Sequence, residues 1–191
     1  MYIVCVLDTG MFPTTTIIHN QVVSNYMNTS TLISKYSPLL LVGSVILCIL
    51  VGAAGSVFTV TGPGSWYDLL TKPSFNPPNW IFGPVWTTLY ILMGISLYLI
   101  LLEWKKGVDI RCAGGLFAVQ LFLNFIWSYM FFGLQSPTYA FIVIALLWVA
   151  ILATILTFLR ISRIAAYLLV PYILWVSFAS ILNYSIMILN P

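Results

Sequence analysis

Charged side chains are scarce in this chain of 191 residues, and their scarcity excludes most water-soluble folds. Asp, Glu, Lys and Arg together make up 6% of the sequence, whereas a typical soluble domain holds about 25%. Hydrophobic residues make up 61%, and the mean hydropathy is +1.05. With too few charges to cover a surface in contact with water, the chain is expected to lie in a membrane.

The few charges are separated by long uncharged windows. These windows run over 36–67, 73–102, 112–159 and 164–191. A helix needs about 20 apolar residues to cross the hydrocarbon of a bilayer. The third window is long enough for two crossings, and Gln135-Ser136-Pro137 divides it with residues typical of a turn. A transmembrane β-barrel would need alternating polar and apolar residues, which this sequence lacks.

We therefore predict an all-α membrane protein, a five-helix bundle with a long Trp- and Pro-rich loop between its first two helices. The bundle is expected to form a single domain over 38–191. Its helices are expected at about 38–60, 84–102, 112–134, 138–159 and 164–188. Residues 1–37 are polar and irregular, and we interpret them as a disordered tail in which Met27 is an alternative start.

The predicted spans hold no histidine and no charged side chain, and the only histidine is His19. Pumps and ion-driven transporters usually keep ionisable groups within the membrane, and acid–base hydrolysis needs such groups as well. Haem ligation by histidine inside the bundle is disfavoured for the same reason. No internal repeat is visible, which argues against an inverted-repeat transporter. The composition thus favours ligand binding or a structural role over conventional catalysis.

The cations lie at the ends of the spans and form no run, so they do not indicate nucleic-acid binding. With five spans, one side of the membrane holds Lys35, Lys105, Lys106, Arg111, Arg160 and Arg163, and the other holds only Lys72. Cytoplasmic segments carry the excess of Lys and Arg. We predict a multi-pass protein of the cell membrane with its amino terminus inside; an organelle membrane is the alternative.

The segment from Trp66 to Gly94 holds three of the seven tryptophans and four of the ten prolines. Proline fixes φ and removes a backbone donor. The prolines at 73, 77, 78 and 84 therefore predict a stiff, extended path. A rigid aromatic loop above a membrane bundle suits a lid over a flat apolar ligand.

Three helices place aromatic and amide side chains on one face each, at helical spacing. These faces are Trp86, Tyr90 and Met93; Gln120, Asn124, Trp127 and Phe131; and Trp175, Ala179 and Asn183. Converging faces would form an apolar pocket with a few polar anchors. In the alternative interpretation, Trp and Tyr lie at the membrane interface, as expected for Trp104 and Trp148, and the amides join helices.

Three stretches resemble the signature of the tryptophan-rich sensory protein and translocator protein family. They are WYDLLTKPSFNPPNWIFGPVWTTLYILMG at 66–94, QLFLNFIWSYMFFG at 120–133 and VPYILWVSFASILNY at 170–184. The resemblance covers about 38–190. It implies a five-helix bundle, often a homodimer, whose cavity beneath the first loop binds porphyrins such as protoporphyrin IX and haem. No cofactor is implied beyond that ligand.

The resemblance also implies which residues contact the ligand. In the lid they are Trp66, Tyr67, Pro73, Pro77, Pro78 and Trp80. In the cavity they are Trp86, Tyr90, Asn124, Trp127, Trp175, Phe178, Ala179 and Leu182. Trp86 and Trp175 match two tryptophans that bacterial members use in light- and oxygen-dependent porphyrin breakdown, so they are the candidate catalytic residues.

Three departures from the family pattern bear on function. Phe75 stands where the lid usually has a third tryptophan, and no basic residue follows Tyr184, so the sterol motif of animal members is missing. The small-residue spacing that the family uses for dimers becomes Gly115 followed by Val119 four residues later, although Gly114 and Ala118 could substitute. Our hypothesis is a porphyrin-binding receptor or sensor in lipid. A porphyrin-degrading enzyme, a tetrapyrrole or sterol transporter and a structural scaffold are the alternatives.

Overall fold

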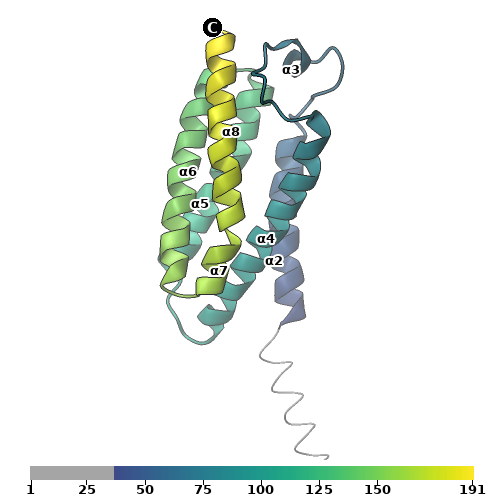
Figure 1. Ribbon diagram of the computed structural model, residues 1–191. Helices are drawn as coiled ribbons and strands as arrows, with labels where there is room; N and C mark the ends of the chain where they lie inside the picture. The colour runs from purple at the N-terminus through teal and green to yellow at the C-terminus, as the bar shows by residue number, and fades with distance from the viewer. Residues whose placement is uncertain (1–36) are drawn as a thin grey trace, which may run out of the picture. The chain divides into compact units, whose positions relative to one another are not determined.

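The computed structural model describes residues 37–191, so the expected tail lies outside the described residues except for Ser37. Residues Pro38–Pro191 form one compact unit whose regular secondary structure is entirely helical, with no strand. Within this unit, five helical stretches are long and apolar enough to cross a membrane. They run side by side, with the loop that carries α3 and the carboxyl terminus at the same end (Figure 1). The prediction of an all-α membrane protein with five spans is confirmed.

The helices have the following bounds in chain order. They are α2 (Pro38–Ser56), α3 (Trp66–Leu69), α4 (Asn79–Lys105), α5 (Arg111–Ser128), the π-helix η1 (Tyr129–Gly133), α6 (Pro137–Leu159), α7 (Arg163–Leu168) and α8 (Val170–Leu189). α5 and η1 together form the third span, and α7 and α8 form the fifth.

Local sequence explains where α6 and α7 begin. The Ser136 hydroxyl accepts a hydrogen bond from the Tyr139 N–H, and Pro137 fills the first turn, where no backbone donor is needed. Ser162 caps α7 in the same way through the Ala165 N–H. Gln135 has a φ of 52°, which reverses the chain before α6. The turn expected at 135–137 is confirmed.

The second span begins five residues earlier than predicted, at Asn79 instead of 84. Pro84 therefore lies inside α4, and the expectation that it extends the chain is wrong. Proline leaves the carbonyl four residues before it, that of Trp80, without its helical donor. Membrane helices nevertheless tolerate an internal proline of this kind. The first span is shorter than predicted and ends at Ser56.

The third and fifth spans are less regular than predicted. The last turn of the third span is a π-helix, closed by a hydrogen bond from the Leu134 N–H to the Tyr129 carbonyl at 2.8 Å. The fifth span is interrupted at Leu169, one residue before α8 begins. Pro171 has no N–H for the carbonyl of Tyr167, so an unbroken helix would lose a hydrogen bond there.

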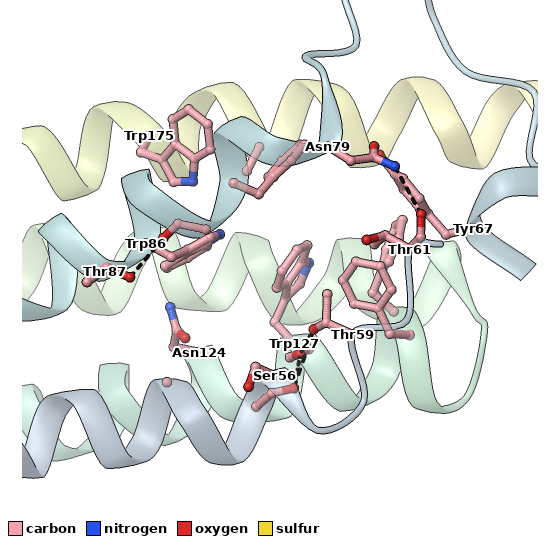
Figure 2. A pocket seen from close by; sticks show the side chains of 18 of the residues that line it. Ser56, Thr59, Thr61, Tyr67, Asn79, Trp86, Thr87, Asn124, Trp127 and Trp175 are labelled. Carbon is pink, nitrogen blue, oxygen red and sulfur yellow. Dashed lines mark hydrogen bonds between the residues drawn. The ribbon is translucent and has the colours of Figure 1, made fainter. Parts of the chain in front are cut away.

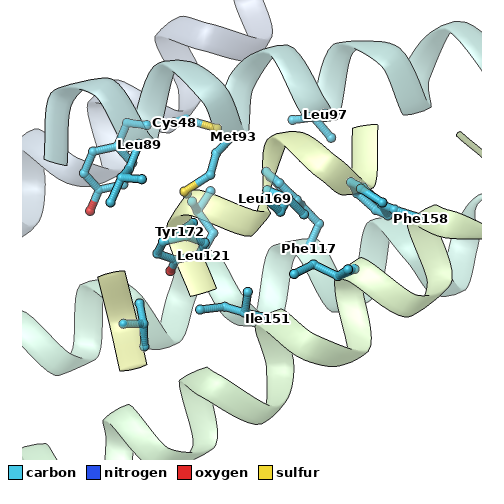
Figure 3. Close-up of a cluster of buried hydrophobic side chains, with 14 of the residues drawn as sticks. Cys48, Leu89, Met93, Leu97, Phe117, Leu121, Ile151, Phe158, Leu169 and Tyr172 are labelled. Carbon is cyan, nitrogen blue, oxygen red and sulfur yellow. The ribbon is translucent and has the colours of Figure 1, made fainter. Parts of the chain in front are cut away.

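The core lies between α4, α5, α6 and α8 (Figure 3). Its buried side chains include Met93 from α4, Phe117 from α5, Phe158 from α6 and Tyr172 from α8. The Phe117 and Phe158 rings stack with their centroids 5.9 Å apart. Close packing of this kind is what holds helices together in lipid, where burial of apolar surface gives no advantage.

The end of the bundle opposite the loop carries most of the charge. Lys106 forms an ion pair with Glu103 there at 2.7 Å, and Arg111 and Arg163 begin α5 and α7 at the same end. Among residues 37–191, Lys72 is the only cation at the loop end. The orientation of these two ends in a membrane stays a prediction.

Candidate ligand cavity

A cavity of about 550 Å³ lies beneath the loop between α2, α4, α5 and α8 (Figure 2). Small-molecule sites commonly enclose roughly 300–1,000 Å³. None of the side chains that line this cavity is charged. The cavity is therefore suited to a molecule whose enclosed part is apolar and neutral.

Tryptophans from three different helices form its walls. Trp86 of α4 and Trp127 of α5 stack with ring centroids 6.4 Å apart and planes 29° apart. Trp127 in turn stacks on Phe131 of η1 at 5.6 Å. Trp175 of α8 meets Phe82 of α4 edge to face at 5.9 Å. The three aromatic faces expected to converge do so.

Asn124 forms hydrogen bonds with residues of two neighbouring helices at one end of the cavity. Its side-chain oxygen accepts a hydrogen bond from the Tyr90 hydroxyl, and its Nδ2 donates to the Tyr172 hydroxyl at 2.9 Å. All three side chains are buried, so this network joins α4, α5 and α8 within the membrane. A second amide, Asn183, accepts from the Trp127 indole at 3.1 Å and donates to the Pro137 carbonyl at 2.8 Å.

The indole N–H of Trp175 is buried and has no hydrogen-bond partner among the described residues. Its nitrogen is directed toward Trp86 and the interior of the cavity (Figure 2). A buried donor without an acceptor costs free energy. An acceptor atom on a bound molecule would remove that cost.

Small residues of α2 form the opposite wall. A Cβ added at Gly52 would collide with the ring of Tyr90, so glycine is needed there for the ring to lie against the α2 backbone. Nearby, the Ser128 hydroxyl donates to the Gly55 carbonyl at 2.8 Å. Glycine at 52 therefore allows the close approach of α2 to α4, and the bond to the Gly55 carbonyl joins α2 to α5.

Residues 57–78, here called the lid, cover the loop end of the cavity. Ser65 caps the short helix α3, which brings the buried Tyr67 into contact with the cavity. Burial raises the pKa of the Tyr67 phenol, and its hydrogen bond to Asn76 Oδ1 at 3.1 Å partly opposes this effect. Lys72 Nζ lies 4.8 Å from the centroid of the Tyr67 ring. The lid thus places a neutral phenol inside the cavity and a cation directly above it.

The cavity opens between the loop ends of α2 and α4. The exposed lining residues on this side include Ala53 and Ser56 from α2 and Asn79 and Gly83 from α4. The α5 and α8 sides are lined by residues that are buried or half-buried. The opening therefore lies where the lid leaves α2 and rejoins α4.

The structure brings most of the expected ligand-contacting residues together. Those that line the cavity are Tyr67, Trp80, Trp86, Tyr90, Asn124, Trp127, Trp175, Ala179 and Leu182. Trp80 lies at the start of α4 instead of in the lid, and it is 74% exposed. Whether these residues bind a ligand stays a prediction.

The other expected residues lie outside the cavity lining. The Trp66 ring packs edge to face on Phe131 at 5.6 Å, behind the wall. Phe178 lies behind Trp175 at 5.5 Å and lines a separate apolar groove between α4 and α8. Pro73, Pro77 and Pro78 belong to the lid without lining the cavity. These residues shape and support the site without facing its interior.

Several lining residues were not among the predicted ligand contacts. They are mainly Gly52, Ser56, Thr61, Asn79, Phe82, Thr87, Phe132 and Ile186. Phe82 lies one turn before Trp86, but the predicted helix began at 84, so this spacing was recognisable only once α4 was seen to begin at Asn79. Phe132 could not be predicted, because the π-helix that turns it toward the cavity has no clear sequence signal. Two further residues differ from expectation. Gln120 is buried without a hydrogen-bond partner in the described part of the chain, and Trp148 donates to Ser177 at 2.8 Å in mid-span instead of lying at the interface.

Comparison with known proteins agrees with this architecture. The model of the TspO/MBR family matches residues 44–189. The chain is 53% identical over 147 residues to the tryptophan-rich protein TspO of Chlorobaculum tepidum, covering 76% of this chain and 92% of that protein. It is 45% identical over 152 residues to the protein of the same name from Archaeoglobus fulgidus, covering 78% and 96%. It is 41% identical over 137 residues to the human translocator protein, covering 69% and 79%. This chain belongs to the TspO/MBR family of integral, multi-pass membrane proteins.

Proposed function

We propose that this protein is a membrane receptor that binds a flat tetrapyrrole, such as protoporphyrin IX or haem, in the aromatic cavity. The observation that carries the proposal is the convergence of Trp86, Trp127 and Trp175, from three separate helices, on one uncharged cavity. Indole rings present broad apolar faces that stack on other aromatic systems. The sensory and translocator names in the family are consistent with a role in recognising such a molecule.

The geometry also suggests how a porphyrin would be oriented. Its apolar rings would lie between Trp86 and Trp175, since no charge lines that part of the cavity. Its propionate groups would lie at the loop end, where Lys72 sits above Tyr67. A carboxylate would otherwise lose its hydration without compensation, which is strongly unfavourable. The polarity of the cavity therefore matches the polarity of the ligand.

Fluorescence titration of the purified protein with protoporphyrin IX tests this proposal. Binding should quench tryptophan emission. Trp86→Ala and Trp175→Ala should each weaken binding about tenfold or more, because a buried aromatic contact is worth roughly 1–3 kcal/mol. Trp104→Ala is the matched control, since Trp104 is exposed at the other end of α4. Unchanged affinity in both cavity variants would reject the site.

Light-dependent oxidation of the bound porphyrin by dioxygen is a second candidate function. The observation that favours it is the stacked series Trp86, Trp127 and Phe131 beside the cavity, because indoles are readily oxidised. Illumination in air should bleach bound porphyrin faster than free porphyrin, and Trp86→Phe with Trp175→Phe should abolish the difference. Equal bleaching rates in the parent protein would leave binding as the function.

A further inference from the structure

The lid is fastened to a helix that is distant from it in sequence. It leaves α2 after Ser56 and returns to α4 at Asn79, yet its middle contacts the carboxyl end of α8. There the Asn190 Oδ1 accepts a hydrogen bond from the Thr71 N–H at 2.9 Å, and Asn190 Nδ2 donates to the Thr71 carbonyl at 3.0 Å. One side-chain amide thus pairs with both backbone groups of one lid residue. We call this pair of bonds the clasp.

Asn190 is itself held firmly on α8. Its backbone N–H and its Nδ2 both donate to the Ile186 carbonyl, at 3.1 and 2.8 Å. Ile186 lines the cavity one turn earlier. The clasp therefore connects the lid directly to a wall of the cavity.

Other hydrogen bonds of the lid involve residues that line the cavity, among them one between the Thr59 and Ser128 hydroxyls at 3.2 Å. Asn79 Nδ2 donates to the Thr61 carbonyl at 3.0 Å, and Tyr67 donates to Asn76. Neither Thr71 nor Asn190 lines the cavity. Thr71 is exposed, so water can replace the bonds of the clasp when the lid moves. The clasp can therefore open without any change in the surface that a ligand contacts.

We propose that Asn190 is a positioning residue that holds the lid closed, and that opening of the clasp limits the exchange of ligand. This inference rests on the proposed function of the cavity. Loss of the two exposed hydrogen bonds should raise the population of open lid about tenfold, given the modest net free energy of such bonds. Both the association and the dissociation rate should then rise together. The equilibrium affinity should hardly change, because neither Thr71 nor Asn190 lines the cavity.

Stopped-flow quenching by protoporphyrin IX tests the proposal on the full-length protein in phospholipid nanodiscs. Asn190→Ala should raise both rate constants about tenfold and leave Kd within about twofold. Thr71→Ala is the matched control, because the hydrogen bonds between Asn190 and Thr71 involve backbone atoms of Thr71, and its rates should equal those of the parent. Asn190→Asp keeps the acceptor but loses the donor, so its rates should fall in between.

Hydrogen exchange of the lid amides in the ligand-free protein is a second test of the clasp, and it needs no porphyrin. Asn190→Ala should speed exchange across 62–78, while Thr71→Ala should not. Unchanged exchange would overturn the proposal. Faster exchange with unchanged binding rates would also overturn it, and would indicate passage between α2 and α4 with the lid in place. If the parent bound no porphyrin, the proposed function would fail, and hydrogen exchange alone would decide whether the clasp holds the lid.

Discussion

Lys72 is the only cation that residues 37–191 place at the loop end of the bundle. Its ammonium group donates to the Asp68 carbonyl at 3.1 Å and lies above the ring of Tyr67, a cavity residue. It is half-buried, so a carboxylate that reached it would still be partly in water. The lysine should therefore tune the affinity for an anionic ligand without determining whether a ligand binds.

The first prediction follows from that position. Lys72→Gln should weaken the binding of protoporphyrin IX about two- to fivefold at low salt, as expected for a pair of partly exposed charges. The uncharged dimethyl ester should bind parent and variant equally well, and it serves as the control ligand. Titration of both ligands by fluorescence quenching measures the effect. An equal loss for the two ligands would show that Lys72 supports the lid instead of meeting a carboxylate.

A second prediction concerns the close approach of α2 to Tyr90. Gly52→Ala places a methyl group where the Tyr90 ring lies, and overpacking of this kind typically costs about 1–3 kcal/mol. Thermal unfolding in detergent should show a lower Tm, and porphyrin binding should weaken as the ring is displaced. Gly43→Ala is the control on the same helix, because nothing lies within 4 Å of the added methyl. An unchanged Tm for Gly52→Ala would contradict the packing described.

Some residues of the cavity could be predicted from the sequence and others could not. Trp86, Asn124 and Trp175 could be identified because helical spacing places them on faces with other aromatic or polar residues. Trp66 was expected at the ligand, yet its ring packs on Phe131 behind the wall. The conformation of a loop depends on which bundle residues it meets, and spacing within the loop carries no information about that.

Among the elements, the network centred on Asn124 joins three helices in the middle of the bundle. Polar bonds between membrane helices are worth only about 0.6–1.7 kcal/mol each, but removal of Asn124 affects two of them. The third prediction is that Asn124→Ala lowers stability by about 1–3 kcal/mol, because the Tyr90 and Tyr172 hydroxyls lose their partner. Unfolding in mixed detergent micelles measures the change.

The control for this prediction is Ser185→Ala, which removes an exposed hydroxyl that bonds only within α8. It should leave stability unchanged. Tyr90→Phe, alone and combined with Asn124→Ala, completes a double-mutant cycle. The double variant should lose less stability than the sum of the losses of the two single variants. Strict additivity would mean that the bond between Tyr90 and Asn124 contributes nothing to the bundle.

The irregular elements explain why helix boundaries could be predicted less well than helix number. Pro84 suggested an extended chain, but it lies inside α4, because a membrane helix tolerates the loss of one helical hydrogen bond. The interruption at Leu169 precedes Pro171, a residue that the sequence shows but whose effect depends on packing. Likewise, no residue pattern in Tyr129–Gly133 predicted the π-helix that forms there.

At the scale of the whole molecule, the number of spans was predictable because the membrane imposes it. Lipid offers no partner to a backbone polar group, so each uncharged window must satisfy its own hydrogen bonds as a helix. The windows are bounded by charges such as Glu103, Arg111 and Arg160, which lie at the ends of the helices that formed. How the helices face one another is set by side-chain packing, so the shape and opening of the cavity became clear only from the structure.

The distribution of charge over the whole bundle leads to the fourth prediction, which is its orientation. Cys112 is exposed at the basic end, beside Arg111, whereas Thr71 is exposed at the loop end. The excess of Lys and Arg should keep the basic end in the cytoplasm. In intact bacterial cells, a membrane-impermeant maleimide should therefore label a Thr71→Cys variant but not Cys112.

The labelling experiment needs two variants that each contain a single cysteine. In one variant, Thr71→Cys is combined with Cys5→Ser, Cys48→Ser and Cys112→Ser. In the other, Cys5→Ser and Cys48→Ser leave Cys112 as the only cysteine. Permeabilised cells are the control, in which both proteins should react, since both positions are exposed in the fold. Labelling of Cys112 but not of Thr71→Cys in intact cells would show that the protein has the opposite orientation. The lid and its clasp would then face the cytoplasm, and a porphyrin that reached the cavity through the lid would come from inside the cell.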